Sequence, residues 1–226
     1  ADQPKLADDL FETQRDLNVF LAEYDTPEAL FSDLKVAPDI DRFSVMFSDY
    51  RVLENALQGG FRTNGIEFSL RYKDDTQTDI FGYVRYVLPN TSASNQGVER
   101  GMIFYSINST PLSASNESLW RAALAQDSYT LQFADYDGGN ITPNGISLSF
   151  TKAQYNENPV YLTNVIEVDD KRIGYLMYNG FFSNYETQLN QAFGQLKAAN
   201  VTHLVLDLRY NSGGSVDTAT RLASMI

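Results

Sequence analysis

The chain has 226 residues, of which 43% are hydrophobic, and its 29 acidic and 17 basic residues give a net charge of −12. This length allows one large or two modest domains, and the acidic balance argues against nucleic acids and anionic membrane surfaces as partners. No apolar run approaches the ~18 residues of a membrane span, so neither a transmembrane helix nor a signal peptide is expected. Cysteine is absent, which excludes disulfides, thiol catalysis and cysteine-based zinc sites.

Residues 1–59 are expected to form a helical region. Two short helices are predicted over residues 4–35, the second capped by Thr26 with Pro27 in its first turn. A third is predicted over residues 50–58, ending at two glycines. The first predicted helix has an apolar stripe made of Leu6, Leu10, Leu17, Phe20 and Leu21. Its acidic residues are interpreted as a solvated face rather than metal ligands: Asp8, Asp9, Asp16 and Glu23.

Residues 60–155 have the short alternating apolar segments of a β-rich domain. A glycine-rich loop is predicted over residues 60–66. Strands are predicted over residues 66–72, 82–87, 102–108, 129–133 and 146–150. A helix is predicted over residues 115–125, with Ser115 as its N-cap and an apolar side formed by Leu119, Ala122 and Ala123. Residues 135–145 are predicted to be a plain hairpin loop, because their Asp and Gly spacing fits no EF-hand. No metal site and no cofactor is expected.

Residues 156–226 alternate strands and helices, as a parallel α/β layer requires. A linker over residues 156–164 is expected, followed by strands over residues 163–168 and 172–178 and a helix over residues 185–199. The apolar run over residues 204–208 predicts a strand buried on both faces. A last helix is predicted over residues 215–226, with an apolar stripe formed by Val216, Ala219, Leu222, Ala223 and Ile226.

The turn between the last strand and helix contains Gly213 and Gly214. Such a turn directs backbone N–H groups towards an arriving negative charge, either a phosphate or an oxyanion formed in a reaction. Its spacing matches neither a P-loop nor a dinucleotide fingerprint, and no basic side chain with phosphate-loop spacing accompanies it. A tight turn without chemistry is the alternative. The only histidine, His203, is interpreted as a strand-end residue that forms a local hydrogen bond beside Thr202, so histidine-based catalysis is not expected.

Asp207 to Gly214, DLRYNSGG, resembles the D-L-R-x-N-x-G-G signature of the tail-specific, or C-terminal processing, serine peptidases of family S41. Asp41 to Ser44, the Ile173-Gly174-Tyr175 strand and Phe182-Ser183 are similar to further segments of that family. The resemblance is greatest to cell-envelope members from Bacteroidetes-type bacteria. It implies an α+β multidomain fold: an N-terminal helical region (1–59), a PDZ-like β-rich domain (60–155) and the first, incomplete part of an α/β, ClpP/crotonase-like peptidase core (156–226).

The resemblance implies an endopeptidase in which a serine attacks the peptide carbonyl and a neutral lysine accepts its proton. Gly213 or Gly214 would supply oxyanion-hole backbone. The family's nucleophile and lysine lie further downstream, and neither Ser212, Ser215, Ser224 nor any lysine of this chain has their context. The 226-residue chain is therefore expected to be inactive. Its whole protein is expected in the periplasm or cell envelope of a bacterium, anchored through lipid at a removed N-terminus.

A PDZ-like domain implies polypeptide partners, bound through their C-termini. The resemblance assigns carboxylate capture to Asn64-Gly65-Ile66 and backbone pairing to residues 66–70, which include Phe68. Glu67 is expected to weaken this capture, so a PDZ-shaped spacer without a ligand is an alternative. The rival functional class is a non-enzymatic PDZ-type peptide-binding protein. An uncovered edge of the α/β sheet is also expected to promote a homodimer.

Overall fold

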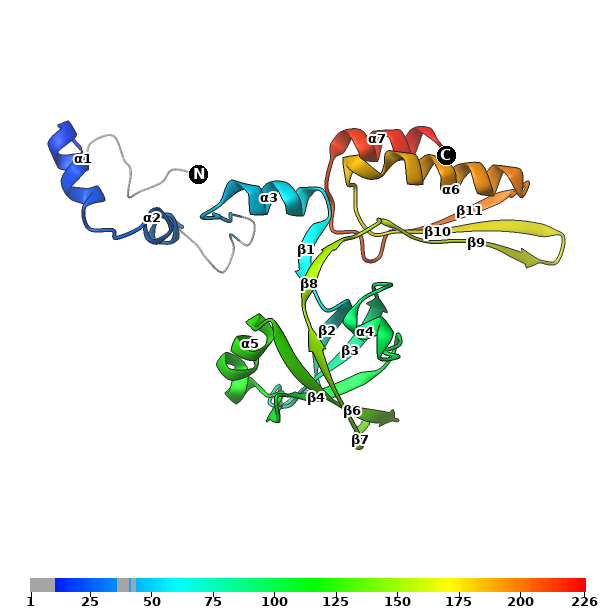
Figure 1. Cartoon of the computed structure of the whole chain (residues 1–226), viewed down its shortest axis with the longest axis horizontal. Coiled ribbons are helices and arrows are strands. Elements are labelled where there is room, and N and C mark those ends of the chain that lie inside the picture. The colour runs from blue at the N-terminus through cyan, green and yellow to red at the C-terminus, as the bar shows by residue number, and fades with distance from the viewer. Residues whose placement is uncertain (1–10, 36–40, 42–43) are drawn as a thin grey trace. The chain divides into compact units, whose positions relative to one another are not determined.

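Figure 1 shows the computed structural model, which describes residues 11–35, 41 and 44–226. The chain divides into two compact units, Ala1–Ala56 and Leu57–Ile226. The predicted boundary between residues 155 and 156 lies inside the second unit and stays a prediction. Among the described residues, no helix has both the length and the apolar character needed to cross a membrane.

The first unit contains α1 (Gln14–Leu21) and α2 (Pro27–Leu34), and α3 (Tyr50–Leu57) runs across its boundary. Thr26 caps α2 as predicted: its hydroxyl accepts the Ala29 N–H at 3.1 Å, and Pro27 is the first helical residue. Several residues of the sequence argument lie outside the described residues: Leu6, Asp8, Asp9, Leu10, Arg42 and Phe43.

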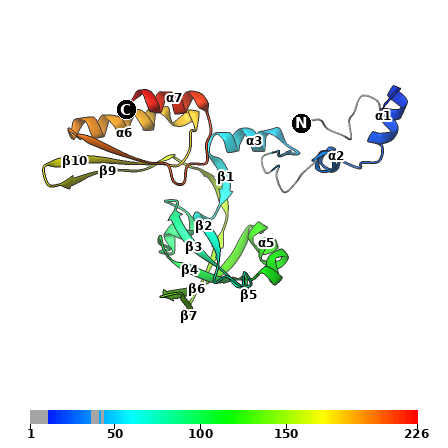
Figure 2. The ribbon, with the colours of Figure 1, turned by 180° about the vertical axis from the view of Figure 1, so that it is seen from behind.

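An antiparallel sheet of six strands dominates the second unit, and α5 (Glu117–Ala125) packs against it (Figure 2). Its strand order is β2-β3-β4-β6-β7, with β5 paired to β4. The strands are β2 (Ile66–Tyr72), β3 (Ile80–Val87), β4 (Ile103–Ile107), β5 (Thr110–Pro111), β6 (Ser128–Asp137) and β7 (Asn140–Thr151). Two short helical segments connect them, α4 (Ser92–Asn95) and η2 (Ala114–Asn116).

The predicted hairpin of residues 129–133 and 146–150 is confirmed, but its strands are longer than predicted. Asp137 pairs with Asn140, so Gly138 and Gly139 alone form the turn. Both glycines have positive φ, 54° and 103°, which a tight hairpin turn requires. Much of the predicted 135–145 loop is therefore strand.

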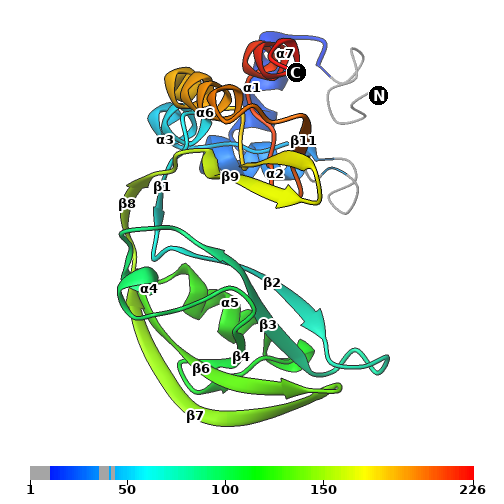
Figure 3. The same ribbon diagram turned by 90° about the vertical axis from the view of Figure 1, so that its right-hand side faces the viewer.

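Residues 60–63 are also strand rather than loop. β1 (Gly60–Thr63) pairs antiparallel with β8 (Ala153–Asn156), and Figure 3 shows the two strands side by side. The prediction of a glycine-rich loop over residues 60–66 is wrong for this part because a strand from ninety residues later supplies its hydrogen bonds. The resulting two-stranded ribbon connects the six-stranded sheet to the segment that follows.

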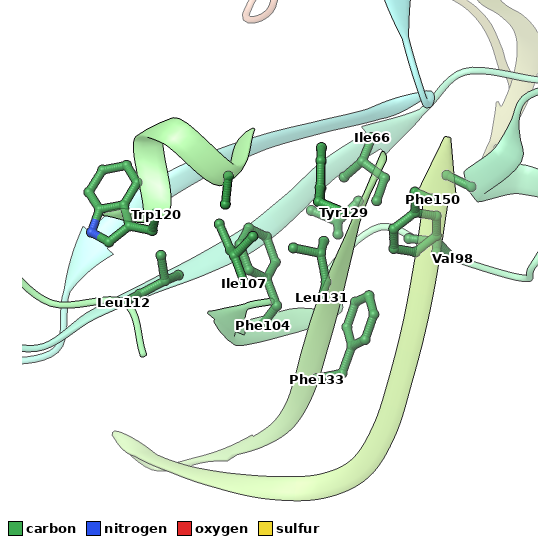
Figure 4. Close-up of a cluster of buried hydrophobic side chains, with 13 residues drawn as sticks. Ile66, Val98, Phe104, Ile107, Leu112, Trp120, Tyr129, Leu131, Phe133 and Phe150 are labelled. Atoms are coloured by element: carbon green, nitrogen blue, oxygen red, sulfur yellow. The ribbon is translucent and has the colours of Figure 1, made fainter. Parts of the chain in front are cut away.

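The core beneath α5 is built around Phe104, Leu131, Phe133 and Trp120, all at most 2% exposed (Figure 4). The Trp120 indole N–H donates to the Ser113 carbonyl at 3.0 Å, which orients its ring. The predicted apolar side of this helix is wrong in part, since Leu119 is 60% exposed.

Ala122 is also exposed, whereas Ala123 is buried as predicted. The helix is rotated so that its largest apolar residue, Trp120, enters the core. The predicted cap is wrong as well: Ser113, not Ser115, accepts the Asn116 N–H at the start of η2.

A second, three-stranded sheet is formed by β9 (Val160–Val168), β10 (Lys171–Tyr178) and β11 (His203–Asp207). Its order is β11-β10-β9, with β10 and β11 parallel as predicted and β9 antiparallel to β10. After η3 (Ser183–Tyr185) come α6 (Glu186–Ala198) and α7 (Val216–Ser224), whose apolar sides pack on one face of the sheet (Figure 1). The predicted linker over residues 156–164 is shorter than expected, because β9 begins at Val160.

The strand predicted to be buried on both faces is half-buried on one. Leu204 and Leu206 pack towards α6 and α7, whereas Val205 on the other face is 47% exposed because no described helix covers that face. Leu208 lies beyond the end of β11 and is 40% exposed. The predicted stripe of α7 is also wrong in part: Val216 and Ile226 are 79% and 71% exposed, and Ala223 is exposed too. Thr218 and Leu222 are the buried residues of α7.

Candidate functional site

The turn after β11 is shaped by the side chain of Asn211. Its Oδ1 accepts the Gly213 N–H at 2.8 Å, and its Nδ2 donates to the Tyr178 carbonyl at 3.0 Å. The amide group therefore closes the turn and also fixes it to the end of the neighbouring strand β10. The backbone N–H of Gly213 is used within the turn.

Gly214 forms a parallel bridge with Phe181. The Phe181 N–H donates to the Gly213 carbonyl, and the Ser215 N–H donates to the Phe181 carbonyl, both at 2.8 Å. In such a bridge one residue bonds to both neighbours of its partner, so the N–H and C=O of Gly214 point the other way. A Cβ at Gly214 would lie 2.4 Å from the Phe181 carbonyl oxygen, and its φ of 131° also requires glycine.

Helix α7 begins directly after this turn, with Ser215 as its N-cap. The outward N–H of Gly214 therefore lies at the positive end of a nine-residue helix. Of the two predicted donors, Gly214 has the geometry to receive an anion from outside, whereas the N–H of Gly213 is bound to Asn211. The arrangement can stabilise a negative charge.

Asp207 fixes the carboxyl end of β11. Its side chain is 4% exposed and accepts from the Arg209 guanidinium at 2.6 Å, the Arg209 backbone N–H at 3.0 Å and the Tyr175 hydroxyl. The hydrogen bonds from Arg209 hold the pKa of Asp207 well below its usual range, in opposition to its burial. Sequence reasoning quoted these residues as a motif without giving them roles. The spacing of Asp207 and Arg209, two residues apart at the end of a strand, is the sequence feature from which their ion pair could have been predicted.

Tyr210 connects the turn to the six-stranded sheet. The Arg100 guanidinium donates to its hydroxyl at 2.9 Å, and the guanidinium groups of Arg85 and Arg100 lie 5.2 and 5.6 Å from its ring centre. The Tyr86 ring packs against it at 5.3 Å between centres. Sequence reasoning missed these contacts. They join residues more than a hundred positions apart, and no local sequence pattern predicts them.

A buried carboxylate, Glu157, lies behind the turn. It is 6% exposed and accepts from Asn179 Nδ2 at 3.3 Å, and the Asn179 carbonyl accepts the Ser212 N–H at 3.2 Å. Burial raises the pKa of Glu157, and the nearby carboxylate of Glu67 raises it further. Sequence reasoning placed Glu157 in a linker and gave it no role.

The residues predicted to bind a peptide lie together at the start of β2. Asn64 and Ile66 are buried at 2% and 4% exposure, Gly65 lies between them, and the Phe68 ring packs on Phe104 at 5.2 Å between centres. β2 is the outer strand of its sheet, so its position is compatible with the addition of a peptide strand. The peptide-binding role itself stays a prediction.

A groove of about 240 Å³ lies between β2 and α5. It lies at the opposite end of β2 from Asn64, Gly65 and Ile66. The groove is lined by Leu70, Arg71, Tyr72, Ile80, Glu117, Trp120 and Arg121.

Two further predictions concern the role of His203 and the binding of metal ions. The hydroxyl of Thr202 lies 2.9 Å from Nδ1 of His203, which confirms the predicted local hydrogen bond. Within the described ranges, no cluster of three or more metal-ligating side chains occurs.

The fold is mixed α/β, with a glycine turn between a strand end and the start of a helix. The sequence model of peptidase family S41 matches residues 172–226, which include that turn. A carboxyl-terminal-processing protease of Picosynechococcus sp. is 32% identical over 68 residues, which is 30% of this chain and 16% of that protein. The C-terminal segment of the chain is thus similar to peptidase family S41.

Solved structures of proteases also align with most of this chain. A crystal structure from Bacteroides fragilis described as an S41 protease is 26% identical, with a TM-score of 0.64, over 90% of this chain and 52% of that one. The photosystem II D1 C-terminal processing protease is 18% identical, with a TM-score of 0.45, over 91% of this chain and 56% of that one. The chain thus spans about half the length of these proteases.

Proposed function

We propose that this chain is the N-terminal portion of a serine endopeptidase of the C-terminal processing type, and that the Gly214 N–H is one donor of its oxyanion hole. The observation that carries the proposal is the outward orientation of that N–H at the start of α7, within the segment matched by the family. Asn211 and Phe181 hold the donor before substrate arrives. Such preorganisation is the main source of oxyanion stabilisation in acyl-transfer enzymes.

A donor alone performs no proteolysis, since an attacking serine and a base must also be present. In this proposal both are supplied by the part of the protein that corresponds to the other half of the Bacteroides fragilis structure. A serine would attack the carbonyl, and a desolvated lysine would accept its proton. The 226-residue chain alone is then inert. A periplasmic or cell-envelope location is proposed with it, supported by the resemblance only.

We propose polypeptides as the substrates, held by the PDZ-like sheet at the edge of β2. The rival is a non-enzymatic peptide-binding protein, which would use the same edge and would need no further residues. The groove between β2 and α5 is compatible with either function. The two are separated by whether the longer gene product cleaves peptide bonds.

The test is therefore made with that longer gene product, on casein and on a tailed peptide. Cleavage is expected, and Gly214→Ala, whose Cβ would lie against the Phe181 carbonyl and displace the Gly214 N–H, should lower kcat by ~10²–10³ with little change in KM. Gly213→Ala is the matched control, because the N–H of Gly213 is bound to Asn211. Circular dichroism checks that both variants fold. Cleavage by the 226-residue chain alone, or full activity of Gly214→Ala, would refute the proposal.

A further inference from the structure

The loop that precedes β2 has little capacity left to capture a carboxylate. The Gly65 N–H donates to the Thr63 hydroxyl at 2.9 Å, and the Ile66 N–H donates to Asn64 Oδ1 at 3.1 Å. Capture of a peptide's C-terminal carboxylate depends on free N–H groups of this kind. A carboxylate would have to displace two side-chain oxygens that are already in place and fixed by the chain.

The loop is also covered. The Ala93 N–H donates to the Asn64 carbonyl, and the Leu88 N–H donates to the Gly65 carbonyl, both at 2.9 Å. A Cβ at Gly65 would lie 1.9 Å from the Thr91 hydroxyl, so the segment that leads into α4 packs directly on the loop. The Gly65 side of the loop is therefore occupied by Thr91.

Glu67 adds an electrostatic obstacle. Its side chain is 27% exposed and forms an ion pair with Arg85 at 3.2 Å. Burial raises its pKa although Arg85 opposes the shift, so the site already stabilises one carboxylate poorly. A second carboxylate beside it would add like-charge repulsion. Arg85 is itself engaged by Glu67 and by the Tyr210 ring.

The open part of the peptide surface lies at the other end of β2. The groove there has an apolar lining from Leu70, Ile80 and Trp120, together with two arginines. Arg121 is paired with Glu117 at 2.6 Å, whereas Arg71 forms no ion pair within the described part of the chain. The charge of Arg71 is therefore complementary to an acidic side chain on a ligand.

We propose that this groove binds extended peptide segments through their backbone and side chains, without a requirement for a free C-terminal carboxylate. The outer edge of β2 pairs with the peptide backbone, an apolar side chain enters the pocket beside Trp120, and an acidic side chain faces Arg71. This inference rests on the proposed peptide-binding function. It changes the expected substrate class from chain ends to internal or unstructured segments.

The test uses the 226-residue chain and the fluorescence of Trp120, its only tryptophan. The probes are eight-residue peptides without tryptophan, each with alternating apolar and acidic residues. Each peptide is made as a free acid, as a C-terminal amide and with three added C-terminal residues. Heteronuclear NMR shifts of β2 and α5 amides locate the binding.

The three forms are expected to bind with Kd values within about twofold of each other. Arg71→Glu should weaken all three by about tenfold, and Lys171→Glu, the same charge change at the exposed start of β10 in the other sheet, should not. Glu67→Gln should leave the ratio of acid to amide near one, because the loop donors stay capped. This variant also tests whether Glu67 alone excludes the carboxylate.

A free acid that binds tenfold or more tightly than its amide would overturn the inference while leaving peptide binding intact. Binding by none of the forms would overturn it too, and would remove this groove from the proposed function. The oxyanion role of Gly214 would be unaffected by either outcome, since it is measured by cleavage in the longer protein.

Discussion

The Arg100 guanidinium donates a hydrogen bond to the Tyr210 hydroxyl at 2.9 Å, across 110 residues of sequence. Arg100 precedes β4 of the six-stranded sheet, and Tyr210 lies three residues before Gly213. The same guanidinium also donates to the Arg85 carbonyl at 2.7 Å. The side chain of Arg100 thus links the six-stranded sheet to the segment that carries the glycine turn.

Tyr210→Phe should remove this hydrogen bond and keep the aromatic packing on Arg85 and Tyr86. A loss of about 0.5–1.5 kcal/mol in the free energy of unfolding is expected, measured by urea denaturation. Tyr136→Phe, an exposed tyrosine that only stacks on Phe81, is the control and should cost less than about 0.5 kcal/mol. In a double-mutant cycle with Arg100→Ala, the two losses should not add. Simple additivity would contradict the link.

The two glycines of the turn should respond differently to alanine. Both have positive φ, 98° for Gly213 and 131° for Gly214, so each substitution strains the backbone by about 1–2 kcal/mol. Gly213→Ala places its Cβ in open space, whereas Gly214→Ala places it against the Phe181 carbonyl. Urea denaturation should therefore show the larger loss for Gly214→Ala. Equal losses would mean that Phe181 does not hold the turn.

Much of the fold could be predicted from local sequence patterns, whereas the errors concern residues whose burial depends on how distant segments pack. Thr26 and Pro27 predicted the start of α2, and the thirteen-residue helix α6 lies within the helix predicted over residues 185–199, with Leu189, Ala192 and Leu196 buried. Leu119 was assigned to the core because it is apolar, yet Trp120 takes that place. Periodicity identifies an amphipathic helix, but the rotation of its buried face depends on which side chain fills the cavity below.

The site was predictable only where it is continuous in sequence. The strand, turn and helix around Gly213 and Gly214 were predicted from the apolar patterns of residues 204–226, and the family resemblance came from the eight residues Asp207 to Gly214 within them. Sequence did not show that Asn211 uses the Gly213 N–H and leaves Gly214 as the outward donor, since this depends on side-chain geometry. Contacts such as Arg100 with Tyr210 depend on how distant segments pack, and no periodic pattern encodes them.

The free energy of unfolding should depend on pH because of Asp207. Its folded-state pKa is depressed by Arg209, so its contribution is present above the unfolded pKa of about 3.9 and is lost as the pH falls below it. Asp207→Asn should cost roughly 1–2 kcal/mol at pH 7, a figure reduced for the exposure of Arg209. The variant should also lose less stability than the parent between pH 5 and pH 3. Asp170→Asn, on an exposed turn, is the control, and identical acid profiles would contradict the role.

β11 is an outer strand of the three-stranded sheet, and we expect it to promote association of two copies. Sedimentation velocity should show a larger species whose fraction rises with concentration. Val205→Lys, on the exposed face of β11, should reduce that fraction. Val216→Lys, on the exposed side of α7, should not. A monomer at all concentrations would refute this expectation.

Glu157 should have the opposite pH dependence to Asp207. Burial and the charge of Glu67 raise its folded-state pKa, so the folded protein binds a proton more tightly than the unfolded chain. Stability should therefore fall as the pH rises from the unfolded pKa through the folded one, and the penalty should be complete above it.

Glu157→Gln keeps the oxygen that accepts from Asn179 and removes the charge. It should stabilise the protein at pH 7–8, and the gain should disappear below about pH 4. Glu99→Gln removes the same charge from an exposed position and should give no such gain. A destabilised Glu157→Gln variant at neutral pH would show instead that the buried carboxylate holds Asn179, and through it the turn, in its ionised form.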